Sequence, residues 1–251
     1  MNRTALLAGA SGGIGLALLQ KLVDDPQISR VFATCRREVV SVDDKVTWLA
    51  LDFTQPGSLA VLLRTIRERT PVIDRLICAP GYLHDAVGQP EKRLDQLLPG
   101  VADSAHDQQE LAYQQRAYLI NALGPLQLFA GCAPLLKISP QPIAMFLSAQ
   151  VGSISDNHLG GWYGYRMAKA ALNMGVRSAA IEAQRWRNNA TVVAVHPGTT
   201  RTHLSAPFIQ RRRSGVQSAA TAASQLHQLL ETLQPEQNGT FVRSNGEMLP
   251  W

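Results

Sequence analysis

The sequence predicts an α/β protein with a doubly wound parallel sheet of about seven strands in a three-layer α/β/α arrangement. Short apolar runs alternate with longer amphipathic runs along the chain, which is typical of repeated β-α units. A glycine-rich turn directly follows the first apolar run. No linker, composition break or internal repeat divides the 251 residues, so we expect a single domain over residues 1–251.

The expected elements follow in a regular order. Strands are expected at 4–8, 31–34, 46–51, 75–78, 143–147, 191–196 and 240–243. Helices are expected near 14–22, 58–69, 108–136, 163–187 and 218–233, because apolar residues recur there at helical spacing. A further short helix could form at 91–98. Pro125 is expected to bend the helix at 108–136 or break its hydrogen-bond ladder. The loops at 82–107, 149–162 and 203–217 are expected to shape a substrate pocket.

Charge and composition argue against nucleic-acid and membrane partners. Charged residues make up 17% of the chain, and the net charge of +5 is mild. Basic residues are scattered apart from Arg36-Arg37 and the run 211–213, whereas nucleic-acid binders concentrate charge in a stripe with interleaved aromatics. The N-terminal stretch lacks the apolar region of a signal peptide, and no run of 18 apolar residues occurs. We therefore expect a cytoplasmic protein.

The three cysteines carry no metal-binding or disulfide pattern. Cys35, Cys78 and Cys132 form no close pair and have no metal-ligand spacing. We expect reduced, buried thiols and no metal site. His158, His196 and His203 have no ligand partners at metal spacing either, so we interpret them as structural or substrate-lining.

The turn 9–15 is the first candidate binding site. Gly9, Gly13 and Gly15 follow the first strand and open the first helix, as in a Rossmann-type dinucleotide site. Glycines permit a sharp turn, close approach of backbone N–H groups to a pyrophosphate, and tight packing of helix on sheet. The helix N-terminus then holds phosphates through its free N–H groups. An ordinary strand-to-helix turn is the alternative.

The end of the second strand indicates which dinucleotide is bound. An acidic residue there would bind a free ribose 2′-hydroxyl, whereas this chain has Arg36 and Arg37. Guanidinium groups suit a dianionic 2′-phosphate, so NADP(H) is favoured over NAD(H). The alternative is that both arginines are solvated in a loop. Asp52 is expected to accept a hydrogen bond from adenine or to cap a loop, and Gly81 to pass close to the cofactor or to form a turn.

A tyrosine and a lysine provide a candidate proton-transfer pair. Tyr165 and Lys169 lie four residues apart on an expected helix, so they share a face. A nearby ammonium is expected to lower the phenol pKa toward neutrality. Ser148 ends the fifth strand, where open α/β sheets bind ligands and where a hydroxyl could polarise a substrate oxygen. Asn121 precedes Gly124-Pro125, where a bent ladder could free a backbone carbonyl for water.

With these residues in this order, the chain resembles a short-chain dehydrogenase/reductase over nearly its whole length. The resemblance implies a catalytic tetrad in which Tyr165 is the acid/base, Ser148 positions substrate, Lys169 lowers the tyrosine pKa and Asn121 holds a relay water. It also implies that Pro197-Gly198 and the threonines after it border the nicotinamide and phosphates. The expected cofactor contacts are Gly9, Ser11, Gly13, Ile14, Gly15, Arg36, Arg37, Asp52, Phe53, Ala79, Gly81, Tyr165, Lys169, Pro197, Gly198, Thr199, Thr200 and Thr202.

Within this family, the chain looks most like the C-factor and sniffer-like carbonyl reductases, on the stretches 89–92, 121–125, 152–157 and 246–251. It departs from the family pattern at three places. Ala8 replaces a common threonine, and 78–81 replaces an Asn-Asn-Ala-Gly sequence. These two positions commonly support each other by hydrogen bonding, so we expect their joint loss to be compensated, with a less rigid turn. Ser148 and Tyr165 are 17 residues apart, which is longer than usual and puts an extra loop beside the substrate. Tyr163 is a rival phenol, but only Tyr165 lies four residues before Lys169.

The expected function is hydride transfer between NADP(H) and a small carbonyl or alcohol substrate, with Tyr165 as general acid/base. The alternative is a C-factor-like signalling or regulatory protein that binds a dinucleotide. The resemblance also implies a homodimer or homotetramer formed through the long helices near 108–136 and 163–187.

Overall fold

The structure, a computed structural model of the chain, describes residues 2–36, 43–85, 88–97, 104–210 and 214–251. Its seven strands form one sheet in the order β3-β2-β1-β4-β5-β6-β7, and every neighbouring pair is parallel. The strands are β1 (Arg3–Ala8), β2 (Ile28–Cys35), β3 (Val46–Ala50), β4 (Arg75–Cys78), β5 (Ile143–Leu147), β6 (Thr191–His196) and β7 (Phe241–Arg243). The predicted fold class is confirmed.

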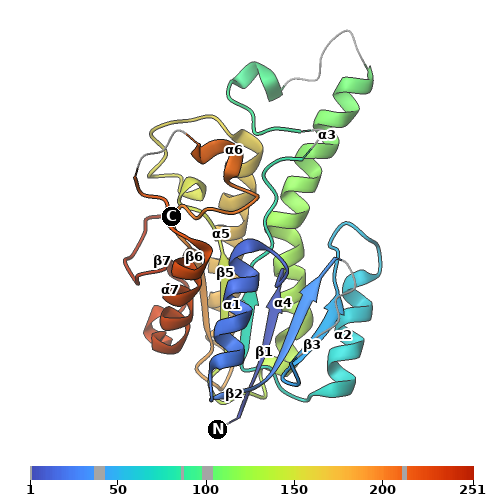
Figure 1. Cartoon of the computed structure of the whole chain (residues 1–251), viewed down its shortest axis with the longest axis vertical. Coiled ribbons are helices and arrows are strands. Elements are labelled where there is room, and N and C mark those ends of the chain that lie inside the picture. The colour runs from blue at the N-terminus through green and yellow to red at the C-terminus, as the bar shows by residue number, and fades with distance from the viewer. Residues whose placement is uncertain (1, 37–42, 86–87, 98–103, 211–213) are drawn as a thin grey trace.

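Helices cover both faces of the sheet (Figure 1). The helices are α1 (Gly13–Asp24), α2 (Ser58–Arg69), α3 (Ser104–Tyr118), α4 (Gly124–Leu136), α5 (Tyr163–Ala183), α6 (Ala206–Ile209) and α7 (Ala219–Thr232). A π-helical segment, η2 (Leu119–Leu123), joins α3 to α4, and three single 3₁₀ turns are η1 (Leu94–Leu97), η3 (Gln150–Gly152) and η4 (Pro235–Gln237). The helix α6 lies where we expected only loop; Pro207 in its first turn has the fixed φ that suits a helix start.

Alternate residues of each central strand supply the two halves of the core. In β1, Leu6 and Ala8 pack with α2, α4 and α5, whereas Ala5 and Leu7 pack with α1 and α7. This two-residue alternation follows from the pleat, and burial of both faces explains why the strands are continuously apolar. Chain order reverses between β1 and β4, so the crevice beyond their carboxyl ends is the place where such sheets bind ligands.

The long helix after η1 continues through its proline. Pro125 lacks an N–H group, and the N–H of Gly124 bonds to the carbonyl of Leu119, five residues back. The ladder therefore shifts to π spacing at 119–123 instead of breaking, and π segments of this kind are frequent at functional sites. The disturbance of the hydrogen-bond ladder lies where we expected it, next to Pro125, and the helix continues on either side of it.

This helix, over Leu111–Leu136, is long and apolar enough to cross a membrane by length and composition alone, with a mean hydropathy of 1.5 in its most apolar window of 18 residues. The sequence expectation counted only unbroken apolar runs and so overlooked it. Half of that window is buried inside the protein, where it packs on the sheet. Core helices of water-soluble proteins have the same composition, so the segment alone does not indicate a membrane span.

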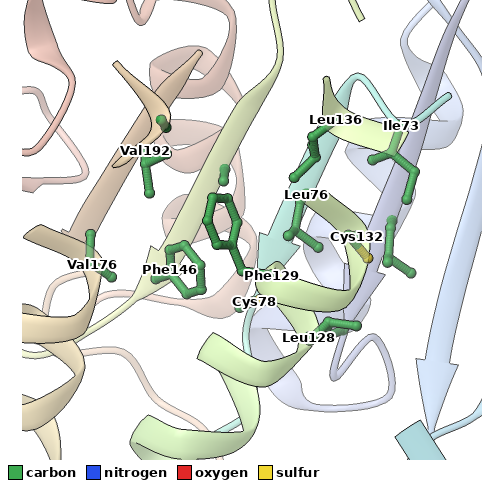
Figure 2. Close-up of a cluster of buried hydrophobic side chains, with 14 of the residues drawn as sticks. Ile73, Leu76, Cys78, Leu128, Phe129, Cys132, Leu136, Phe146, Val176 and Val192 are labelled. Carbon is green, nitrogen blue, oxygen red and sulfur yellow. The ribbon is translucent and has the colours of Figure 1, made fainter. Parts of the chain in front are cut away.

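A cluster of aromatic and aliphatic side chains anchors α4 and α5 to the sheet (Figure 2). The Phe146 ring of β5 is fully buried and meets the Phe129 ring of α4 edge to face, with 5.9 Å between centroids. Phe129 in turn stacks on Trp186. Cys78 and Cys132 lie in the same cluster, and all three cysteines are buried, as expected.

We predict that Phe146→Ala lowers the free energy of unfolding by about 3–5 kcal/mol, because it leaves a cavity under α4 and α5. Urea denaturation measures the change. Ile138→Ala is the control, since Ile138 is 65% exposed and should change stability by less than about 0.5 kcal/mol. A loss at Phe146 as small as the control's would contradict its place at the centre of this cluster.

Candidate active site

Three of the four glycines of the turn 9–15 meet a close backbone or side-chain neighbour where a Cβ would stand. Gly9 has φ of +77°, and a Cβ there would lie 2.9 Å from the nitrogen of Pro80. A Cβ on Gly13 would lie 2.8 Å from Cγ2 of Thr202, and one on Gly15 would overlap the carbonyl oxygen of Gly9. The turn is therefore tight on three sides. Helix α1 begins with no side-chain cap, so its first N–H groups are left for an anion.

Thr34 supports this turn, which the sequence did not predict. The N–H of Gly9 donates to Oγ1 of Thr34 at 3.1 Å, and the N–H of Ala10 donates to the Thr34 carbonyl at 2.9 Å. The N–H of Ala79 donates to the Ala8 carbonyl at 3.0 Å, which ties the loop after β4 to the same place. These contacts hold the turn to the end of β2 and to the loop after β4.

Arg36 and Asp52 lie together at the ends of β2 and β3. Oδ1 of Asp52 accepts hydrogen bonds from the N–H and the hydroxyl of Thr54, at 2.8 and 2.7 Å. Burial raises the pKa of Asp52, but these bonds and the nearby charges of Arg36 and Arg116 outweigh it and hold the pKa below its usual value. The loop-capping interpretation of Asp52 is thus what the structure shows.

Three further residues that we expected to contact the cofactor have the following surroundings. The Phe53 ring packs against Gly124 at the start of α4, so a cofactor contact by this residue would come from its backbone. Ser11 is exposed in the turn, and Gly81 lies against Leu204 with ordinary backbone angles. Arg37 and the arginine run 211–213 lie outside the described residues.

Tyr165 and Lys169 lie one helical turn apart on α5, as predicted. Both are buried, with side chains 8% and 2% exposed. The Lys169 ammonium donates to the carbonyl of Leu147 at the end of β5, at 2.9 Å, and lies 5.8 Å from the centroid of the Tyr165 ring. The pair therefore sits directly at the carboxyl edge of the sheet.

The expected lowering of the Tyr165 pKa is not produced by the protein groups around it. Burial raises the pKa of Tyr165 well above its ordinary value, and burial lowers the pKa of Lys169 to about 7. The physical reason is that both groups lose water, which disfavours a phenolate and an ammonium alike. The expectation considered the attraction between the two groups and left out their desolvation.

Ser148 is held by a partner that the sequence analysis missed. Its hydroxyl donates to Oδ1 of Asn173 at 2.6 Å, and its side chain is 4% exposed. Asn173 follows Lys169 by four residues on α5, so Tyr165, Lys169 and Asn173 form one stripe at positions i, i+4 and i+8. That spacing was present in the sequence and could have identified Asn173.

Asn121 lies in η2 and is fully buried. Its Nδ2 donates to the carbonyl of Tyr82 at 2.7 Å, and its Oδ1 accepts from the N–H of Tyr82 at 3.0 Å. The side chain is thus committed to the loop after β4. Because Pro125 lacks an N–H group, the backbone carbonyl of Asn121 has lost its usual α-helical donor.

A cavity of about 740 Å³ opens beside these residues. The expected site residues that line it are Ile14, Ser148, Tyr165, Pro197, Gly198, Thr199, Thr200 and Thr202. Lys169 and Asn121 are buried and do not line the cavity, and Gly9, Arg36, Asp52, Phe53, Ala79 and Gly81 do not line it either. The rest of the lining comes from Leu83, from the loop 149–162 and from the segment that leads into and forms α6.

The histidines occupy different parts of this region. His158 and His196 line the cavity, and burial together with the charge of Arg243 lowers the pKa of His196 to about 4. His203 stacks on His84, with 6.1 Å between ring centroids. Nε2 of His84 lies 3.2 Å from the carbonyl oxygen of Leu204, so the loop after β4 contacts the segment that leads into α6.

Comparison with known proteins agrees with the family that the sequence resembles. A family profile described as short chain dehydrogenase matches residues 3–213. An uncharacterised oxidoreductase of Schizosaccharomyces pombe is 24% identical over 269 residues, covering 100% of this chain and 98% of the relative. The C-signal protein of Myxococcus xanthus is 31% identical over 142 residues, covering 57% of this chain and 81% of the relative.

Two solved structures share the fold over the whole chain. The carbonyl reductase Sniffer of D. melanogaster superposes with a TM-score of 0.80 at 24% identity, covering 100% of both chains. An NADPH-bound carbonyl reductase from chicken fatty liver superposes with a TM-score of 0.83 at 23% identity, covering 100% of this chain and 94% of the other.

We predict a stability change with pH that comes from Lys169. Its pKa is about 7 in the folded protein and 10.5 ordinarily, so between these values the unfolded chain binds one more proton. The free energy of unfolding should therefore rise with pH in this window, by roughly 1 kcal/mol per pH unit relative to Lys169→Met. Urea denaturation of both proteins at two pH values inside the window measures it.

Lys92→Met, at an exposed lysine, is the matched control for this comparison. If the difference between the wild type and Lys169→Met were the same at both pH values, Lys169 would not be buried as the structure describes.

Proposed function

Because the chain belongs to the short-chain dehydrogenase family, we propose that it is an NADP(H)-dependent carbonyl reductase with Tyr165 as its general acid/base. The family is one of oxidoreductases that bind nicotinamide dinucleotides. The observation that carries the proposal is that Ser148 and Tyr165 line one wall of the 740 Å³ cavity, with Lys169 one helical turn behind. A module that only bound a dinucleotide would not need this arrangement.

The turn 9–15 fits a dinucleotide. Its glycines leave no side chain between the chain and a pyrophosphate, and the uncapped N-terminus of α1 offers N–H donors and the positive end of the helix dipole. Thr200 and Thr202 border the same cavity, and Thr202 contacts Gly13. We expect the pyrophosphate between the turn and these threonines, and the nicotinamide near Pro197 and Gly198.

The preference for NADP(H) rests on arginine at the end of β2. Arg36 lies close enough to Asp52 to affect its pKa, so a guanidinium is present where the adenosine ribose is expected. The NADPH named for the chicken carbonyl reductase supports the same cofactor.

The dinucleotide, when bound, would supply the hydride; the chain's own residues would handle the proton. Tyr165 would donate its phenolic proton to the substrate oxygen during reduction. The Ser148 hydroxyl would turn from Asn173 to the same oxygen and fix its position. Lys169 would favour the phenolate left on Tyr165, and the Asn121 carbonyl would hold a water that returns the proton.

A homodimer or homotetramer is the assembly that we propose. On α5, Met167, Met174 and Ile181 are exposed at intervals of seven residues and so lie along one face, and Leu111 and Tyr118 of α3 are exposed at the same interval. Such apolar stripes suit helix pairing between subunits.

A signalling role is the second candidate, favoured by the match to the C-signal protein over 57% of this chain. It would require dinucleotide binding without turnover. The following variant separates the two candidates.

We predict that Tyr165→Phe lowers kcat by roughly 10²- to 10⁴-fold, since it removes only the acid/base hydroxyl. NADPH oxidation, followed by absorbance with a panel of carbonyl compounds, measures kcat, and fluorescence titration measures cofactor affinity. NADPH should still bind the variant normally. Tyr163→Phe is the matched control and should retain turnover. If Tyr165→Phe turned over as fast as the wild type, Tyr165 would not be the general acid/base.

We predict that replacing Arg36 and Arg37 by Ala raises the Kd for NADPH by roughly 10- to 100-fold, because charge-assisted hydrogen bonds to the 2′-phosphate are lost. The Kd for NADH should change little. Isothermal titration of both cofactors makes the comparison. Equal affinity of the wild type for NADH and NADPH would contradict 2′-phosphate recognition.

A further inference from the structure

The loop between Ser148 and Tyr165 ends in a strained run of backbone. Gly160, Gly161 and Trp162 have φ of +63°, +64° and +53°, so three consecutive residues are left-handed. Glycine adopts this region freely, but a tryptophan there is uncommon and unfavourable. Among the described residues other than glycine, only Trp162 and Asn189 have positive φ. Strain of this kind persists only where the surroundings impose it, and it is concentrated at functional sites.

Hydrogen bonds to Glu91 and from Arg166 hold the backbone around Trp162 in this conformation. The N–H of Trp162 donates to the Glu91 carbonyl, and the N–H of Gly164 donates to Oε2 of Glu91 at 2.9 Å. Glu91 is 3% exposed, so its carboxylate is a buried anion at the positive end of α5. On the other side, the N–H of Arg166 donates to the Trp162 carbonyl at 2.8 Å.

The strained backbone places the indole beside the reacting phenol. The Trp162 ring lies edge to face with Tyr165, at 6.3 Å between centroids and 76° between planes. It also lies edge to face with Phe208 of α6, at 5.0 Å and 65°. All three rings line the 740 Å³ cavity. Two of them thus form an aromatic wall next to the group that would protonate the substrate oxygen.

We propose that Trp162 and Phe208 determine substrate specificity, and that the site takes carbonyl compounds in which a flat aromatic ring is attached directly to the carbonyl carbon. A ring bonded to a carbonyl whose oxygen meets Tyr165 lies within reach of this wall. There its edge or face meets an aromatic partner, whereas a puckered saturated ring of the same size cannot match that geometry. Glu91 is a positioning residue, since it acts on substrate only through Trp162 and the start of α5. This inference rests on the proposed reductase function.

The test compares two ketones of equal carbon count, acetophenone and cyclohexyl methyl ketone, with NADPH as reductant. The wild type should favour acetophenone in kcat/KM. In Trp162→Leu and in Phe208→Leu, the ratio of the two kcat/KM values should fall by about three- to ten-fold, the size of one aromatic pairing. Trp162→Phe should keep the ratio. Leu159→Ala, at a non-aromatic cavity residue that is 89% exposed, is the control and should also keep it.

Phe208→Leu carries no backbone strain, so it tests the wall even if Trp162→Leu does not fold. Glu91→Ala should raise the KM for acetophenone and lower the ratio while leaving the KM for NADPH unchanged. Glu91→Gln, which keeps an acceptor for the N–H of Gly164, should restore both. If Glu91→Ala changed thermal stability but not the ratio, Glu91 would have a structural role only.

Equilibrium binding separates a failure of this inference from a failure of the proposed function. Isothermal titration of the NADP⁺-loaded protein with each ketone should show tighter binding of acetophenone, lost in Phe208→Leu. Selective binding without turnover would refute the reductase function and leave the aromatic wall supported. Turnover of both ketones with a ratio that neither Trp162→Leu nor Phe208→Leu alters, or a wild-type preference for the cyclohexyl ketone, would overturn the inference.

Discussion

The hydrogen bond from the Lys169 ammonium to the Leu147 carbonyl joins the two elements on which the site depends. It ties α5 to the carboxyl end of β5, and both bonded atoms are buried. A buried ammonium with one carbonyl partner is weakly stabilised, which is why its pKa falls to about 7. The same bond sets the height of Tyr165 and Asn173 above the sheet, and Asn173 then holds Ser148.

The second constraint comes from the opposite side of the crevice. Asn121 uses both polar atoms of its side chain to hold the backbone of Tyr82. It occupies a π-helical turn that exists because Pro125 cannot donate to the helix ladder. Pro125 thus leaves the buried backbone carbonyl of Asn121 without its usual α-helical donor, while the Asn121 amide holds the loop after β4. That loop reaches the segment before α6 through His84, whose partner Leu204 lines the cavity.

Periodicity and order along the chain were enough to predict the sheet, the long helices and the grouping of Ser148 with Tyr165, because these follow from local pattern and from parallel strands ending at one edge. The sequence did not reveal Thr34 or Glu91, since each acts on a residue far away in the chain through a backbone hydrogen bond that leaves no spacing to detect. Asn173 was detectable at i+8 from Tyr165. The pKa of Tyr165 was predicted in the wrong direction, because burial is a property of the folded protein and the sequence shows only which charges are near.

The long loop between Ser148 and Tyr165 contains a conflict between a residue type and its backbone conformation, at Trp162. Most of this chain agrees with its fold at every level: strands are apolar on both faces, and glycines stand where the backbone must turn or approach closely. Trp162 breaks that agreement, because a glycine would satisfy its backbone better, as at the two positions before it. The backbone carbonyl of Glu91 and two aromatic rings hold it nonetheless. The residue is unfavourable for the backbone but places an indole next to the phenol, in agreement with the role in substrate recognition that we propose for it.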